Sequence, residues 1–142
     1  MKAWIVAGSP EAHRPAGGAP GPGDFVIAVD AGLLHAQRWG WPVHLLIGDL
    51  DSLAEAGAAP PAGIDLIRAP RAKDLTDLEM AVAEAVARGA DEIVICAALG
   101  GRTDHLLANV LLLARPDLAG RTALLADGPD TLRLLAGGET LV

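Results

Sequence analysis

The stretch from Phe25 to Ser52, FVIAVDAGLLHAQRWGWPVHLLIGDLDS, contains two apolar runs with a helix-forming segment between them. The runs at residues 25–29 and 43–47 are short and almost wholly apolar, which is typical of strands buried on both faces. Residues 31–39 predict a short helix that ends at the glycine and proline of the sequence WGWP. A strand, a helix and another strand in succession indicate a parallel sheet.

The same alternation continues on both sides of this stretch. Further strands are expected at residues 3–7, 64–68, 92–98, 122–126, 132–135 and 140–142, and helices at residues 75–88 and from Thr103 or Asp104 to Ala114. Segment 8–23 is rich in glycine and proline and predicts a loop, and residues 54–63 predict a connector. The sequence therefore predicts an α/β fold, with a mostly parallel sheet covered by helices on both faces.

Composition excludes several classes of partner. The 142 residues suit one domain, and a net charge of −7 gives no general attraction to nucleic acid or to anionic lipid. Cys96 is the single cysteine and lies in an apolar run, so we expect a small buried strand residue. No stretch has transmembrane length or a signal-peptide pattern, which favours a soluble, cytoplasmic protein.

Aspartates recur in or just after the loops that leave the expected strands. They are Asp30, Asp49, Asp51, Asp74, Asp77 and Asp104. Ligands of open parallel sheets bind beyond the carboxyl ends of the strands, so these side chains are candidates for one site. An acidic cluster repels itself unless a cation is present, and carboxylate oxygens suit Mg²⁺.

Two acidic motifs each allow two interpretations. In GDLDS, Asp49 and Asp51 project to the same side if the strand continues, or else they satisfy backbone donors in a turn. In KDLTD, Asp74 can cap the helix, with Asp77 in its first turn. Alternatively, one of this second pair binds the metal while Lys73 approaches a phosphate.

The motif GGRTDH combines a glycine pair with charged residues. Gly100 and Gly101 let the backbone approach a ligand closely, the following helix start offers free N–H groups to an anion, and Arg102 can bind phosphate bidentately. The alternative is a tight turn with a capping Thr103 or Asp104. The spacing matches neither a P-loop nor the glycine pattern of dinucleotide-binding folds.

The remaining candidate side chains favour structural roles. His13, His35 and His44 lack partners at metal-ligand spacing, and we interpret each as an ordinary histidine. Trp39 and Trp41 are expected to pack against a helix end.

In residues 29–53 and 73–113, the chain resembles the thiamine pyrophosphokinase family, through GDLDS, KDLTD and GGRTDH in this order. The resemblance implies a Rossmann-like fold and an Mg²⁺-dependent enzyme, a homodimer, that converts ATP and thiamine into thiamine diphosphate and AMP. It assigns the metal to Asp49 and Asp51 with Asp77 or Asp74. It places Arg102 near the phosphates, and we expect Ser52, Lys73, Gly100 and Gly101 to bind the nucleotide as well. Asp104 or Asp30 is expected to be catalytic, as the base or as the group that orients the hydroxyl.

Two departures from the family pattern bear on these expectations. The second strand of the family ends in Asp-Gly-Gly-Ala, where this chain has Asp30, Ala31 and Gly32, so a Cβ narrows the backbone approach. The family continues into a small β domain, so we expect a catalytic domain at residues 1–128 and the start of a truncated or missing β domain at residues 129–142. Two alternatives stay open: a pyrophosphokinase for another small alcohol, such as a hydroxymethylpterin, and a catalytically silent nucleotide-binding domain.

Overall fold

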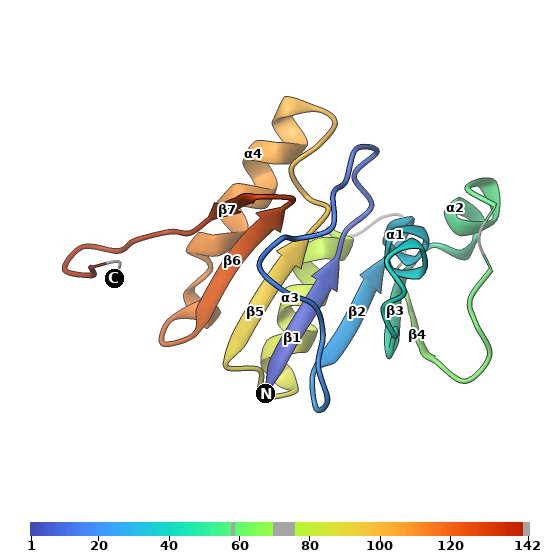
Figure 1. The fold of residues 1–142 in the computed structure, drawn as a ribbon, viewed down its shortest axis with the longest axis horizontal. Coiled ribbons are helices and arrows are strands. Elements are labelled where there is room, and N and C mark those ends of the chain that lie inside the picture. Colours follow the sequence, from blue (N-terminus) through green and yellow to red (C-terminus); the bar gives the residue numbers. More distant parts are fainter. Residues whose placement is uncertain (58, 70–75, 141–142) are drawn as a thin grey trace.

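The strands of the described chain form one sheet in the computed structural model, which describes residues 1–57, 59–69 and 76–140 (Figure 1). The side chains of Leu50 and Ser52 are not described. The strand order is β4-β3-β2-β1-β5-β6-β7, and only the β6–β7 pair is antiparallel. The strands are β1 (Lys2–Val6), β2 (Phe25–Val29), β3 (Leu45–Gly48), β4 (Asp65–Arg68), β5 (Glu92–Cys96), β6 (Thr122–Asp127) and β7 (Asp130–Leu132).

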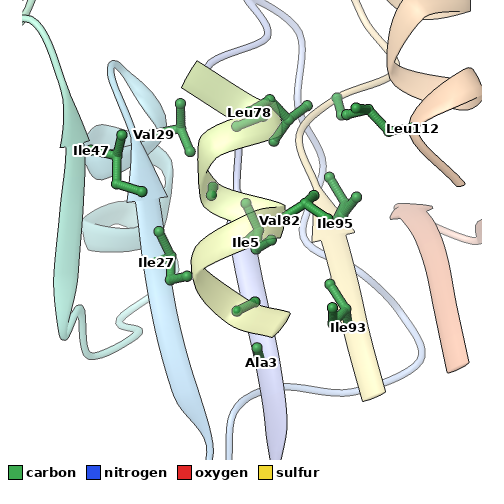
Figure 2. Close-up of a cluster of buried hydrophobic side chains, with 14 of the residues drawn as sticks. Ala3, Ile5, Ile27, Val29, Ile47, Leu78, Val82, Ile93, Ile95 and Leu112 are labelled. Atoms are coloured by element: carbon green, nitrogen blue, oxygen red, sulfur yellow. The ribbon is translucent and has the colours of Figure 1, made fainter. Parts of the chain in front are cut away.

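Helices cover both faces of this sheet, as the sequence predicted. They are α1 (Gly32–Arg38), α2 (Leu50–Glu55), α3 (Asp77–Ala87) and α4 (Thr103–Leu111), followed by the 3₁₀ turns η1 (Leu112–Ala114) and η2 (Pro116–Leu118). Figure 2 shows Val82 of α3 beside Ile5 of β1, and Leu78 of α3 belongs to the same hydrophobic cluster. Successive strand residues point to opposite faces, so Trp4 and Val6 pack instead in the cluster that contains Ala36 of α1.

Two segments differ from the sequence-based expectation. Residues 50–55 form α2, where the sequence suggested either a continued strand or a turn, followed by a connector from residue 54. At the end of the chain, β7 occupies Asp130–Leu132 and no strand covers residues 133–135. The turn at Gly128 and Pro129 brings β7 back beside β6 earlier than expected, with Asp127 opposite Asp130. The strand expected at 140–142 falls largely outside the described residues.

Within the described ranges, no helix is long and apolar enough to cross a membrane.

Candidate ligand pocket

A pocket of about 770 Å³ lies beyond the carboxyl ends of the central strands β1, β2 and β5. Its walls come from four parts of the chain: the loop after β1, the residues after β2, the start of α3, and the glycine turn with α4. This is the edge at which open parallel sheets bind their ligands, and the volume suits a small organic molecule. Among its lining residues are five of the predicted site residues: Asp30, Asp77, Gly100, Gly101 and Arg102.

Asp30 sits directly after β2 in a backbone conformation that is uncommon for residues other than glycine. Its φ is 49°, in the left-handed region, and its N–H donates to the carbonyl oxygen of Ile47 at 2.9 Å. Its Oδ1 accepts a hydrogen bond from the backbone N–H of Asp49 at 3.2 Å. Ala31, at the position where the resemblance led us to expect a glycine, also lines the pocket. The strained backbone directs the aspartate toward both the pocket and the GDLDS motif.

Of the two interpretations of GDLDS, the continued strand is wrong, and the one in which an aspartate of the motif accepts from a backbone N–H is confirmed for Asp49. Asp49 precedes α2, its carbonyl oxygen accepts from Leu53 N–H at 3.2 Å, and its Oδ1 accepts from Asp51 N–H at 2.9 Å. These bonds make Asp49 a helix N-cap and place Asp51 in the first turn of α2. Neither residue lines the pocket, although Asp49 is bonded to Asp30, which does.

The start of α3 is capped by Thr76, whereas the sequence analysis had suggested Asp74 as the cap. The Thr76 hydroxyl accepts from Glu79 N–H at 3.1 Å, and the Glu79 carboxylate accepts from Thr76 N–H at 2.6 Å, which is a capping box. Asp77 lies in the first turn, as predicted, and lines the pocket. Lys73 and Asp74 lie outside the described residues.

At the glycine turn, Arg102 and Asp104 form a bidentate ion pair. Arg102 Nε donates to Asp104 Oδ1 at 3.0 Å, and an Nη atom donates to Oδ2 at 2.7 Å. Arg102 itself is the N-cap residue of α4 and makes no side-chain capping bond, so the cap expected at Thr103 or Asp104 is wrong. Arg102 lines the pocket and Asp104 does not.

Two carboxylates of the pocket could contribute to holding a divalent ion such as Mg²⁺. In residues 1–57, 59–69 and 76–140, no group of three or more His, Cys, Asp or Glu side chains is arranged to hold a metal. Asp30 and Asp77 nevertheless both line the pocket. Mg²⁺ commonly takes one or two protein carboxylates together with phosphate and water oxygens, so a polyphosphate can complete this donor set.

Sequence reasoning missed several lining residues. Ser9 belongs to the loop after β1, while His105 and Asn109 lie one turn apart on α4. Asn109 Nδ2 donates to the carbonyl oxygen of Ala98 at 2.9 Å and so ties α4 to the end of β5. Two signals could have found them. The loop after β1 follows a strand end, where ligands bind, and His105 and Asn109 are four residues apart, which puts them on the same face of α4.

Structural roles are confirmed for two residues outside the pocket. Trp41 is buried and packs edge-on against Trp39, beyond the end of α1. Cys96 is fully buried in β5, and burial raises the pKa of its thiol to about 12.

The fold and the pocket define an α/β protein with an acidic, glycine-lined ligand site over the ends of its central strands. Residues 22–124 match the family model described as thiamin pyrophosphokinase, catalytic domain. The chain therefore belongs to the thiamin pyrophosphokinase family.

Solved structures agree with this assignment. The chain is 32% identical to the thiamin pyrophosphokinase of Geobacillus thermodenitrificans, with a TM-score of 0.73 over 89% of this chain and 60% of that one. The enzyme from Bacillus subtilis gives 28% identity and a TM-score of 0.74, over 89% and 61% of the two chains. The family protein from Enterococcus faecalis gives 34% and 0.69, over 89% and 62%.

The chain thus spans about three fifths of the length of these relatives. A comparison with curated proteins gave no match.

Proposed function

We propose that this chain forms the nucleotide-binding part of an enzyme that transfers pyrophosphate from ATP to thiamine, giving thiamine diphosphate and AMP. One observation carries the proposal: Asp30, Asp77 and the glycine turn 100–102, which are far apart in the sequence, line one pocket. The family assignment supports the same reaction.

In this proposal the substrate is the Mg²⁺ complex of ATP. The metal ion neutralises phosphate charge when it is bound. Asp77 would hold it from a pocket wall, with Asp49, Asp51 and Asp74 as the further candidate ligands, and Asp30 connects Asp49 to the pocket. Arg102, Lys73 and Ser52 serve the phosphates, and the glycine pair lets the backbone approach them closely.

The transfer step needs positioning more than a protein nucleophile. The hydroxyl oxygen of thiamine forms a bond to the β-phosphorus, the bond from that phosphorus to the α–β bridging oxygen breaks, and AMP leaves. The hydroxyl proton passes to a carboxylate, for which Asp30 and Asp104 are the candidates. Asp104 must first exchange its bond to Arg102 for one to the acceptor.

Several expectations stay predictions alongside this one. They are the homodimer, the cytoplasmic location, and the division between a catalytic domain at residues 1–128 and a following segment.

Isothermal titration with Mg²⁺–ATP tests the proposed binding site. The variants Asp49→Asn, Asp51→Asn and Asp77→Asn each remove one charge, and asparagine caps a helix as well as aspartate does, so α2 keeps its cap. We expect about tenfold weaker binding or more, equivalent to about 1.4 kcal/mol. Asp65→Asn is the matched control, because Asp65 is exposed at the amino end of β4, at the end of the strands opposite to the pocket.

The acceptor is tested separately by AMP release. We expect release with thiamine and none with a hydroxymethylpterin. Unchanged Mg²⁺–ATP affinity in all three folded variants would count against the site, and AMP release with the pterin alone would count against thiamine.

A further inference from the structure

His35 is a buried polar residue that contacts a wall of the pocket without lining it. It belongs to α1, its exposed fraction is 7%, and its Nε2 lies 2.7 Å from the carbonyl oxygen of Ser9. A carbonyl oxygen only accepts, so Nε2 carries the hydrogen of this bond. The other ring nitrogen, Nδ1, is buried and has no hydrogen-bond partner within the described part of the chain.

Close packing of α1 against β1 brings His35 to this position. Gly32 opens the helix, and a Cβ there would overlap the carbonyl group of Val6 at the end of β1. The ring of Trp39 stacks on His35 with centroids 5.9 Å apart and planes inclined by 20°. The stacked Trp39 ring therefore fixes the orientation of the histidine ring, and its Nε2–H points to the loop after β1.

Ser9 joins this loop to two other parts of the pocket wall. Its N–H donates to the carbonyl oxygen of Ala97, just after β5, at 3.0 Å. A Cβ at Gly100 would lie 2.5 Å from the Ser9 hydroxyl, so the glycine turn packs directly on Ser9. The position of the Ser9 peptide unit thus sets the spacing between the loop after β1 and the glycine turn.

The buried imidazole ring of His35 costs stability that an apolar side chain would not cost. A buried nitrogen without a partner is destabilising, and leucine would fill a similar space with no such atom. What histidine provides at this position is the donor to Ser9.

We propose that His35 is a positioning residue for the pocket: its Nε2–H fixes the Ser9 carbonyl and thereby holds the pocket wall at the spacing that Mg²⁺–ATP binding requires. The inference rests on the proposed function, since it concerns the same site. His35 acts through Ser9 and is not itself among the residues that line the pocket.

Two substitutions separate the donor from the bulk of the side chain. His35→Gln keeps an N–H donor at a similar reach, whereas His35→Leu removes it. We expect Mg²⁺–ATP affinity, measured by titration calorimetry, to fall about tenfold in His35→Leu, equivalent to about 1.4 kcal/mol, and to return to within about threefold of the unaltered chain in His35→Gln. Hydrogen exchange at the Ser9 amide is expected to accelerate in His35→Leu, with the amides of β1 unaffected.

His44→Leu is the control for losing a histidine–backbone hydrogen bond. The His44 Nδ1 accepts from Val26 N–H at 2.9 Å near the amino ends of the strands, so its loss should leave Mg²⁺–ATP affinity unchanged. If His35→Leu does not fold, His35→Asn replaces it, because its shorter amide cannot reach Ser9.

The outcomes distinguish the two claims. If the folded variant without the donor, His35→Leu or His35→Asn, binds Mg²⁺–ATP as tightly as the unaltered chain, the positioning role is overturned and the proposed function stands. Failure of the unaltered chain to bind Mg²⁺–ATP overturns the proposed function itself, and the positioning role falls with it.

Discussion

The carboxylate of Asp30 accepts a hydrogen bond from the backbone N–H of Asp49, at an oxygen–nitrogen distance of 3.2 Å. The two residues are 19 positions apart and follow neighbouring parallel strands, β2 and β3. Gly48 makes the contact possible, because a Cβ at that position would overlap Oδ1 of Asp30. The glycine of GDLDS and the aspartate after β2 therefore form one structural unit behind the pocket.

A methyl group at position 48 is expected to disturb this unit. Gly48→Ala forces Asp30 away from Asp49, and overpacking of this kind costs about 1–3 kcal/mol of unfolding free energy. We also expect weaker Mg²⁺–ATP binding, because Asp30 lines the pocket. Urea denaturation and calorimetry measure the two effects. Gly17→Ala is the control, since nothing lies within 4 Å of a Cβ at that position. If Gly48→Ala and Gly17→Ala have the same unfolding free energy, the clash with Asp30 is refuted.

Substitutions of two neighbouring residues at the start of α3, Thr76 and Asp77, distinguish an effect on helix capping from an effect on ligand binding. Thr76→Ala removes the side-chain half of the capping box and is expected to lower the unfolding free energy by about 1 kcal/mol. Asp77→Asn keeps the cap and is expected to affect Mg²⁺–ATP affinity more than stability. Thermal melts with and without Mg²⁺–ATP measure both changes, and Thr76→Ser, which keeps the hydroxyl, is the control. A larger loss of affinity in Thr76→Ala than in Asp77→Asn would reverse these assignments.

The positions of the strands in the sequence, and the edge of the sheet that carries the pocket, follow from simple sequence rules. Apolar runs such as residues 25–29 and 92–96 identify buried strands, and parallel strands place their carboxyl ends together. These rules place Asp30, Asp77 and the glycine turn at one edge of the sheet, and in the structure all three line the same pocket.

The side-chain partners were harder to predict because competing residues of similar chemistry stand close together. Asp49 caps a helix, α2, that the sequence analysis did not expect, and Thr76 caps α3 where the sequence analysis suggested Asp74. The contact of His35 with Ser9 joins residues 26 positions apart through the packing of α1, which no local pattern encodes.

Asp24 gives the fold a dependence on pH away from the pocket. One oxygen, Oδ2, accepts from the Gly21 N–H and from the indole N–H of Trp4, both at 2.9 Å. The hydrogen bond from Gly21 lowers the pKa of Asp24 most, burial opposes this effect, and the bond from Trp4 lowers it further. A carboxyl group whose pKa is lower in the folded state contributes stability at pH values above its unfolded-state pKa. It loses that contribution as the pH falls through the folded-state value.

Two substitutions at position 24 test this linkage. Asp24→Ala leaves the indole N–H of the buried Trp4 without its acceptor, and we expect a loss of about 1–3 kcal/mol at pH 7. Asp24→Asn keeps an acceptor oxygen but removes the charge. The difference in unfolding free energy between Asp24→Asn and the unaltered chain therefore measures what the negative charge contributes. Urea denaturation from pH 7 down to pH 2 should show this difference shrinking in the acid range, below the ordinary aspartate pKa of about 3.9. A difference that stays constant over the whole range would show that the charge on Asp24 contributes nothing to stability.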